Sequence, residues 1–226
     1  MSTGRGLLYV VATPIGNLED ITLRALRVLR ECDVVVAEDT RRTRQLLTAH
    51  GLSRPLASLP AHAEARRVPA LLTRLLGGET MALCTDAGTP VVSDPGAALV
   101  HAAREAGVTV VPVPGASALT TALAGSGLRG DHVCFLGFLP RSPGKLRRSV
   151  QTGLDADATV AFYESPLRLA RTLALIAPIC ADRPVVVARE LTKVHESFHT
   201  GTAASLAEAF AAKPPRGECT VLIGAS

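Results

Sequence analysis

The feature that most constrains this fold is a pair of turns rich in glycine and proline. Each turn follows an apolar run directly. Residues 12–17 follow the run at 8–11, and the longer turn at 85–96 follows the run at 81–84. Glycine has no Cβ, so a ligand can approach the backbone of such a turn closely. In open α/β sheets, ligands bind outside the carboxyl ends of the strands. The sequence therefore predicts a binding site at these turns.

Strand and helix patterns alternate through the first half of the chain. The valine run at 33–37 is typical of a strand buried on both faces of a sheet. Asp20 and Asp94 precede two helical patterns and are predicted to be their N-caps. Strands are expected at 8–12, 33–37, 80–85 and 108–113, and helices at 20–30, 41–50, 63–76, 94–106 and 118–124. Such alternation predicts an α/β fold with a mostly parallel sheet.

A glycine-rich stretch at 125–131 reads as a linker, so we expect two α/β domains, 1–124 and 125–226. The second half is expected to hold strands at 133–138, 158–163, 184–189 and 219–224, helices at 166–177 and 203–211, and a basic loop at 140–145. No repeat with a period of 20–50 residues is present, which argues against a repeat array.

The composition is that of a globular protein, with 47% hydrophobic residues among 226. No apolar stretch reaches the length of a membrane span, and residues 1–6 are short and polar, so we expect a soluble cytoplasmic protein. The five scattered cysteines are expected to be reduced thiols rather than metal ligands. The net charge of +4 comes mostly from arginine, which fits both a GC-rich genome and phosphate recognition.

Common nucleotide-binding fingerprints are missing. Neither G-x-G-x-x-G nor a P-loop follows the first strand, and Pro14 removes an amide that a phosphate would need. Glu38 and Asp39 end the second strand, where a dinucleotide-binding fold places its ribose-binding acid. An ordinary dehydrogenase or Rossmann methyltransferase is nevertheless disfavoured, because the first turn has the wrong residues and the turn at 85–96 is unusually elaborate.

Helix capping accounts for only part of the long turn. No cap requires the residues at 86–90, and a rigid loop with one carboxylate suits a ligand that carries hydroxyl or ammonium groups. A third turn of small residues at 114–118 also follows a strand and leaves room for a flat ring. Three such turns on neighbouring strands are predicted to form one crevice.

Six segments of the sequence together resemble a known family. The segments that carry the resemblance are 12–22, 37–41, 85–96, 114–118, 162–166 and 189–193. Together they resemble the tetrapyrrole methylase superfamily of S-adenosylmethionine-dependent methyltransferases, and within it the branch that methylates a cytidine ribose 2′-hydroxyl in 16S ribosomal RNA. Ala12 and Leu167 depart from the pattern, which usually has glycine and histidine there.

The resemblance implies a two-domain fold with a mostly parallel N-terminal sheet, a mixed C-terminal sheet and a ligand cleft between the domains. It also implies a homodimer that acts on small-subunit ribosomal RNA or the assembled small subunit, with S-adenosylmethionine as methyl donor and no metal. The residues that it assigns to donor binding are Pro14, Asp86, Gly88, Thr89, Ser117, Ala118 and Tyr163.

The reaction also needs a group that removes a proton from the hydroxyl. Glu38 and Asp39 are the first candidates for catalysis, with Glu164 and Lys193 as further ones. The acidic pair precedes three arginines, and the simpler interpretation is a capping and salt-bridge cluster. The expected RNA-binding residues are Arg41, Arg42, Arg44, Arg141, Lys145, Arg147, Arg148 and Lys193, with Phe135 and Phe138 placed to stack on bases.

Two other functions stay open on the sequence. One is methylation of a tetrapyrrole or another small acceptor within the same superfamily. The other is a non-catalytic RNA-binding or ribosome-assembly factor. Binding of S-adenosylmethionine separates the second alternative from both enzymes.

Overall fold

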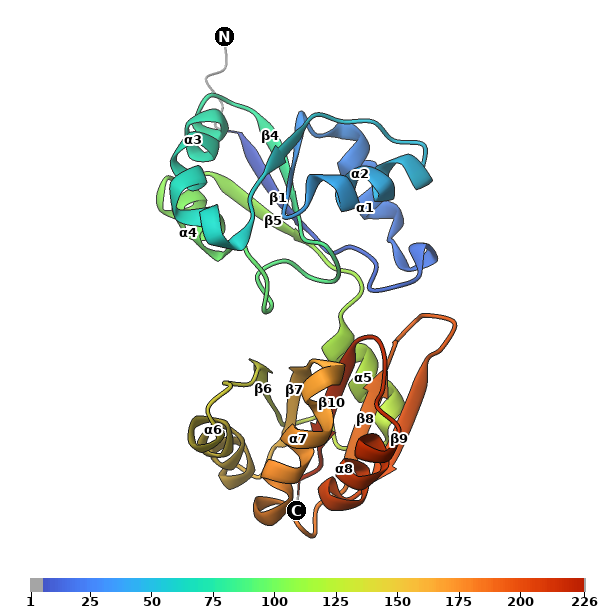
Figure 1. The fold of residues 1–226 in the computed structure, drawn as a ribbon. Helices are drawn as coiled ribbons and strands as arrows, with labels where there is room; N and C mark the ends of the chain where they lie inside the picture. Colours follow the sequence, from blue (N-terminus) through green and yellow to red (C-terminus); the bar gives the residue numbers. More distant parts are fainter. Residues whose placement is uncertain (1–5, 226) are drawn as a thin grey trace. The chain divides into compact units, whose positions relative to one another are not determined.

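The computed structural model describes residues 6–225 (Figure 1). The short polar segment at residues 1–6, on which the expected location partly depends, therefore lies almost wholly outside the described residues. The chain divides into two compact units, the first ending at Ser117 and the second beginning at Ala118. The boundary predicted after residue 124 lies inside helix α5 (Ala118–Ser126), which packs on strands of the second unit. None of the helices in residues 6–225 has the length and apolarity that a membrane crossing requires.

The first unit is a five-stranded sheet in the order β3-β2-β4-β1-β5, and all of its strand pairs are parallel. Its strands are β1 (Leu7–Val11), β2 (Val34–Ala37), β3 (Leu56–Ser58), β4 (Thr80–Cys84) and β5 (Thr109–Val113). Its α-helices are α1 (Leu23–Glu31), α2 (Thr40–Ala49), α3 (Glu64–Leu76) and α4 (Ala97–Glu105). The predicted parallel sheet is confirmed.

Alternation along the strands divides the core of the first unit into two layers. Val34 and Val36 pack with α3 and α4 on one face, while Val35 packs with α1 and α2 on the other (Figure 1). Successive side chains of a strand point to opposite faces, so the valine run fills both layers. Asp20 is not the cap of α1 as predicted, because the Thr22 hydroxyl accepts a hydrogen bond from the Ala25 amide at 3.1 Å.

The second unit holds a mixed sheet in the order β6-β7-β10-β8-β9. Its strands are β6 (Val133–Phe138), β7 (Thr159–Glu164), β8 (Val185–Arg189), β9 (Ser197–Gly201) and β10 (Cys219–Ile223). Helices α6 (Pro143–Asp155), α7 (Pro166–Ile176) and α8 (Ala203–Ala212) share one core with the sheet. Strands β6 and β7 pair in parallel. Strand β10 lies between β7 and β8 and is antiparallel to both, and β9 is antiparallel to β8.

Candidate functional site

The three predicted turns lie side by side at the carboxyl edge of the first sheet. Strand β1 pairs with both β4 and β5, so the turns that follow these strands are neighbours. Thr13 and Gly88 exchange two backbone hydrogen bonds of 2.9 and 3.0 Å. The Thr89 hydroxyl donates to the Ala116 carbonyl at 3.3 Å, which joins the second turn to the third. The turns therefore form one connected backbone surface.

Small residues let these turns approach each other closely. Gly88 has a φ of +82°, and a Cβ there would lie 3.4 Å from Ile15 Cγ2. A Cβ on Gly115 would lie 3.0 Å from the Ala12 Cβ. A side chain at Gly115 would crowd the first turn, and a side chain at Gly88 would be strained by the left-handed φ. Pro14 is buried beside this contact, whereas Asp86, Thr89 and Ser117 are partly exposed.

The long turn carries backbone strain. Val91 and Ser93 adopt left-handed φ angles of 76° and 65°. For a non-glycine residue this conformation costs on the order of 1–3 kcal/mol, and such residues cluster at ligand-binding sites. Gly96 has a φ of +119°, and a Cβ there would lie 2.6 Å from Leu83 Cδ2. The turn is thus held in one conformation by its neighbours.

Asp94 does not cap the following helix, contrary to the sequence prediction. The N-cap of α4 is Gly96. Glu64, at the start of α3, accepts hydrogen bonds from the Gly96 and Ala98 amides at 3.0 and 2.9 Å. A carboxylate from another helix thereby satisfies two of the orphan amides of α4. The Asp94 carboxyl is left available for another role.

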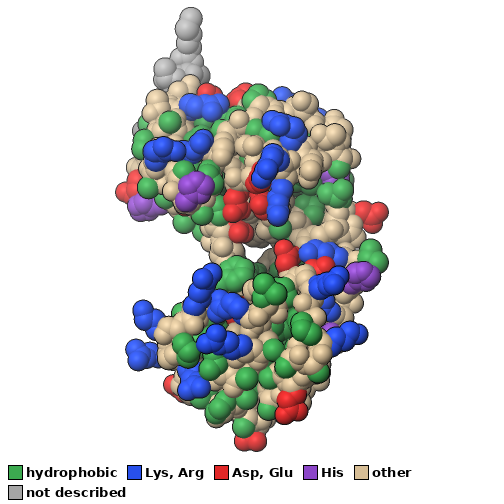
Figure 2. Space-filling model, in the orientation of Figure 1, with side chains coloured by type: hydrophobic (Ala, Val, Ile, Leu, Met, Phe, Trp, Pro, Cys, Tyr) green, Lys and Arg blue, Asp and Glu red, His purple; other side chains and the backbone are tan. Residues whose placement is uncertain are grey.

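An acidic group joins the ends of β2 and β4. The Asp39 amide donates to Asp86 Oδ1 at 3.1 Å, and the Asp86 amide donates to Glu38 Oε2 at 3.4 Å. The Arg42 guanidinium lies 3.4 Å from Asp86 Oδ2. Burial, together with the negative charges of Asp86 and Asp39, raises the pKa of Glu38. Figure 2 shows acidic side chains gathered beside basic ones on the first unit.

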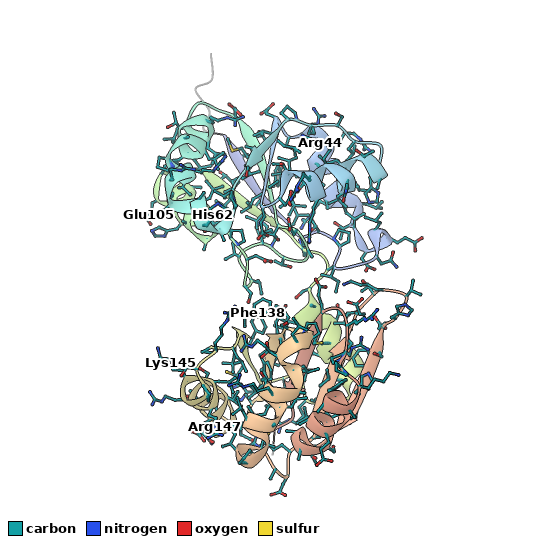
Figure 3. All side chains as sticks on the ribbon, in the orientation of Figure 1. Arg44, His62, Glu105, Phe138, Lys145 and Arg147 are labelled. Atoms are coloured by element: carbon teal, nitrogen blue, oxygen red, sulfur yellow. The ribbon has the colours of Figure 1, made fainter. Side chains whose placement is uncertain are left out.

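Asp39 is occupied by structural interactions. It is the N-cap of α2, and its carboxylate accepts hydrogen bonds from the Arg41 amide at 2.8 Å and from the Arg41 guanidinium at 2.8 and 3.2 Å. The Arg41 hydrogen bonds lower the pKa of Asp39 to about 2. A carboxylate with so low a pKa is a weak base. Arg41, Arg42 and Arg44 are all exposed, and Arg44 projects from α2 (Figure 3).

Asp94 differs from Asp39 in its electrostatics. It is partly buried in the long turn, near Glu38 and Asp86. Burial, followed by the negative charge of Glu38, raises the pKa of Asp94 to about 6, and the Thr85 hydroxyl offsets only part of this rise. A carboxyl group with a pKa near the operating pH is suited to proton transfer.

In the second unit, Tyr163 lies within an aromatic cluster. Its ring meets Phe135 and Phe138 edge to face, at centroid distances of 5.0 and 5.6 Å. The register of β6 shifts between these two phenylalanines, and Gly137 has a φ of +60°. Phe138 is 63% exposed at the end of β6 (Figure 3). The bulge thus turns an aromatic face toward solvent.

A basic group lies at the start of α6, where the sequence predicted a loop. Its members Arg141, Lys145, Arg147 and Arg148 are all exposed. Lys145 and Arg147 project from α6 (Figure 3), and Figure 2 shows basic side chains gathered over this part of the second unit. The Arg147 Nε also donates to the Leu175 carbonyl at 3.0 Å, which fixes its side chain on the surface.

A buried network supports the segment between the aromatic cluster and α6. Glu164 is 2% exposed and accepts hydrogen bonds from the Thr172 hydroxyl at 2.6 Å and the Ser165 amide at 2.8 Å. Arg168 lies 3.3 Å from Glu164 and donates to the carbonyls of Leu139 and Pro140. Glu164 therefore holds a structural arginine in place, a contact that the i,i+4 spacing could have indicated.

Lys193 differs from the exposed basic residues of α6. Its Nζ lies 3.0 Å from Glu190 and 2.9 Å from Glu218, so two carboxylates balance its charge. The Glu190 carboxylate also accepts a hydrogen bond from the Glu218 amide at 2.9 Å. Within residues 6–225, no group of three His, Cys, Asp or Glu side chains is placed to hold a metal ion.

Relatives with known names match almost the whole chain. A protein of Thermotoga maritima, named ribosomal RNA small subunit methyltransferase I, is 46% identical over 219 residues, which cover 96% of this chain and 98% of the relative. A protein of the same name from Xylella fastidiosa is 49% identical over 202 residues, covering 89% of this chain and 74% of the relative.

Solved structures share the fold at lower identity. Diphthine synthase superposes with a TM-score of 0.75 at 18% identity, covering 97% of this chain and 90% of the other. Uroporphyrin-III C-methyl transferase from Thermus thermophilus, complexed with S-adenyl homocysteine, superposes with a TM-score of 0.69 at 19% identity. This superposition covers 97% of each chain. Residues 7–207 match the tetrapyrrole (corrin/porphyrin) methylases, and the chain belongs to this family.

Proposed function

We propose that this chain transfers a methyl group from S-adenosylmethionine to small-subunit ribosomal RNA, at the ribose 2′-hydroxyl of a cytidine. The names of relatives at 46% and 49% identity support the RNA substrate. The observation that carries the proposal is the connected surface of three turns at one sheet edge. The 2′-hydroxyl specificity rests on the sequence resemblance.

The residues at the turns fit S-adenosylmethionine. Glycines at 88 and 115 let the three turns lie against one another, which brings their backbone amides and carbonyls to one edge of the sheet. Asp86 provides a carboxylate for hydroxyl or ammonium groups, and Pro14, Gly88, Thr89 and Ser117 belong to the neighbouring turns of the same edge. Ala118 and Tyr163 belong to the second unit, and their part in donor binding is proposed from the family motifs alone.

The donor supplies an electrophilic methyl group, so the protein must align the acceptor oxygen and remove its proton. Good alignment is worth about 7–11 kcal/mol in favourable intramolecular reactions. Glu38 is the better candidate for proton removal of the two predicted catalytic residues, because its pKa is raised. Asp39 is held by α2 and Arg41, so we assign it the positioning of that arginine.

Basic residues in both units are proposed to contact RNA phosphates. Arg41, Arg42 and Arg44 are exposed at the start of α2, and the α6 group adds four exposed cations in the segment that follows Phe138 along the chain. Exposed arginines beside an aromatic face suit single-stranded RNA, because phosphates and unstacked bases can be bound together. Lys193, whose charge is already balanced, is expected to contribute less.

The protein is further proposed to act as a homodimer in the cytoplasm, where ribosomal RNA is modified. The dimer follows the family resemblance, and the location follows from the proposed RNA substrate. Sedimentation of the purified protein at several concentrations tests the dimer, and a monomer at all of them would contradict it.

Calorimetric titration with S-adenosylmethionine tests the donor site. The Gly88→Ala variant is expected to bind at least about tenfold more weakly, a loss of about 1.4 kcal/mol. Gly130→Ala is the matched control, since a Cβ there meets nothing within 4 Å. Absence of binding by the wild type would favour the non-catalytic RNA-binding factor. Binding with methyl transfer only to a tetrapyrrole would favour the small-acceptor enzyme.

The salt dependence of RNA binding tests the basic group on α6. Each lost phosphate contact is expected to reduce the slope of log K against log salt by about 0.7 for single-stranded RNA. Arg148→Ala should show this reduction, whereas Arg27→Ala should not, because Arg27 already pairs with Glu31 at 2.9 Å. An unchanged slope in Arg148→Ala would remove this residue from the RNA surface.

A further inference from the structure

We propose that the first unit binds double-stranded RNA on a surface of arginines at the outer strand of its sheet, separately from the unpaired RNA bases expected at Phe138. This inference rests on the proposed function and names the form of RNA that each unit recognises. The surface, which we call the β3 surface, consists of Arg41, Arg42, Arg44, Arg66 and Arg67. The last two arginines were not among the RNA-binding residues that the sequence predicted.

The positive charge of the chain is concentrated in this region. Residues 40–67 contain six arginines and a single acidic residue, Glu64, so their formal net charge of +5 exceeds the +4 of the whole chain. The Glu64 carboxylate is directed at the amides of Gly96 and Ala98, at 3.0 and 2.9 Å. An arginine excess due to genome composition would be spread along the chain. The local excess therefore indicates a polyanionic partner.

The topology brings two helices to this outer strand. Within residues 6–225, β3 pairs with β2 and with no other strand. Helix α2 follows β2 and packs in one core layer, while α3 follows β3 and packs in the other (Figure 1). Both helices begin at the carboxyl edge of the sheet, so their first turns flank the end of β3. The Arg67 guanidinium donates to the Ser58 carbonyl at 3.1 Å, which fixes it at the last residue of that strand.

The arginines of the β3 surface are exposed and only partly neutralised. Among residues 6–225, neither Arg44 nor Arg66 forms an ion pair. Arg66 and Arg67 stand in the first turn of α3. A cation in the first turn is unfavourable for the helix itself, because the amino end already carries partial positive charge. Helix stability therefore does not account for these arginines, whereas binding to phosphates does.

The distribution of aromatic residues decides which form of RNA fits. Tyr9, within β1, is the only Phe, Tyr or Trp in residues 1–117, and all five phenylalanines belong to the second unit. Recognition of single strands depends largely on unstacked bases that pack on aromatic rings, whereas double-stranded RNA is recognised through its backbone and its A-form shape. Arginines on two sides of one strand can contact phosphates on both sides of a groove. The β3 surface therefore fits a duplex, and Phe138 fits unpaired bases.

Binding of two RNA probes to the full chain tests this assignment, one a fully paired hairpin and the other single-stranded oligouridylate. Arg44→Gln and Arg66→Gln, one on each helix, should each reduce the slope of log K against log salt for the hairpin by about 1. Both should leave the slope for oligouridylate unchanged. Arg66→Lys keeps the charge and should retain the hairpin slope. Arg30→Gln, in the last turn of α1 at the opposite edge of the sheet, is the matched control and should behave as wild type.

Two further measurements separate a binding role from a structural one. Phe138→Ala should lower the affinity for oligouridylate by at least about fivefold, the lower range for a lost stacking contact, and leave the hairpin affinity unchanged. With small ribosomal subunits as substrate, Arg66→Gln should raise KM and leave kcat unchanged, because this arginine contacts RNA away from the reacting atoms.

Three results would overturn the assignment. The first is an unchanged hairpin slope in either Arg44→Gln or Arg66→Gln. The second is an equal loss for the hairpin and for oligouridylate, since the surface would then bind phosphates whether or not the bases are paired. The third is an equal loss in Arg30→Gln. A wild type that binds the hairpin as expected and transfers no methyl group to small subunits would instead overturn the proposed function and leave the β3 surface as a duplex-binding site.

Discussion

Replacing Asp94 with asparagine is expected to stabilise the first unit at neutral pH. Burial and the charge of Glu38 raise the pKa of this carboxyl from its ordinary 3.8 to about 6 in the folded protein. The native state therefore holds the proton more tightly than the unfolded chain does. Its stabilising contribution is fully present below about pH 3.8 and is lost as the pH rises through about 6.

The magnitude follows from these two values. At 1.36 kcal/mol per pH unit, the interval from 3.8 to about 6 corresponds to about 3 kcal/mol. Asp94 is partly exposed, and screening by water reduces this figure to about 1–2 kcal/mol. Asparagine carries no charge to desolvate. The unfolding free energy of the variant's first unit should thus exceed that of wild type by this amount at pH 8. The two values should be equal near pH 4.

Hydrogen exchange of amides in β1 and β4 is the appropriate assay, because it reports the opening free energy of the first unit by itself. A single melting temperature would mix the two units. Asp39→Asn is the contrasting control. Hydrogen bonds from Arg41 lower the pKa of Asp39, so wild type gains stability above about pH 3.8 and loses it toward pH 2. That variant should be the less stable one at pH 8. A pH-independent effect of Asp94→Asn would refute the electrostatic account.

Three further substitutions test the local structure. Glu64→Ala should destabilise the first unit by about 0.5–2 kcal/mol in the same exchange assay, because two amides of α4 lose their acceptor, whereas Glu105→Ala should change little. Arg168→Met should cost the second unit about 3 kcal/mol in hydrogen exchange of the β7 amides, because it leaves the buried Glu164 carboxylate unpaired, and an equal loss in Arg171→Met would contradict this reason. Gly96→Ala should cost at least about 1 kcal/mol at its left-handed φ, and an unchanged exchange rate in β4 would show that the turn can adjust.

The sequence predicted the elements whose pattern is strong. The valine run became the doubly buried β2, and each apolar run followed by a glycine-rich turn became a strand at the expected place. Weak patterns were missed. Strand β3 has three residues, and β9 is a partly exposed edge strand with polar residues. Pro143 and Gly144 suggested a loop, yet proline in the first turn is compatible with the start of α6.

The site was predictable as a place but not as a set of contacts. The glycine and proline content of the turns predicted them, and the order of the strands in the sheet made them neighbours. The assignment of Asp94 as a cap was wrong because Glu64, from another helix, reaches the same amides. A contact between residues 64 and 96 leaves no periodic signal in the sequence. The pairing of Asp39 with Arg41, by contrast, is local and was anticipated as the simpler interpretation.

The protein is expected to methylate small-subunit ribosomal RNA. The most direct test is to incubate the wild-type protein with small subunits that lack the modification and with isotopically labelled S-adenosylmethionine, then digest the RNA to nucleosides. Label is expected in 2′-O-methylcytidine. Label in a base-methylated nucleoside, or none in the RNA at all, would contradict this expectation.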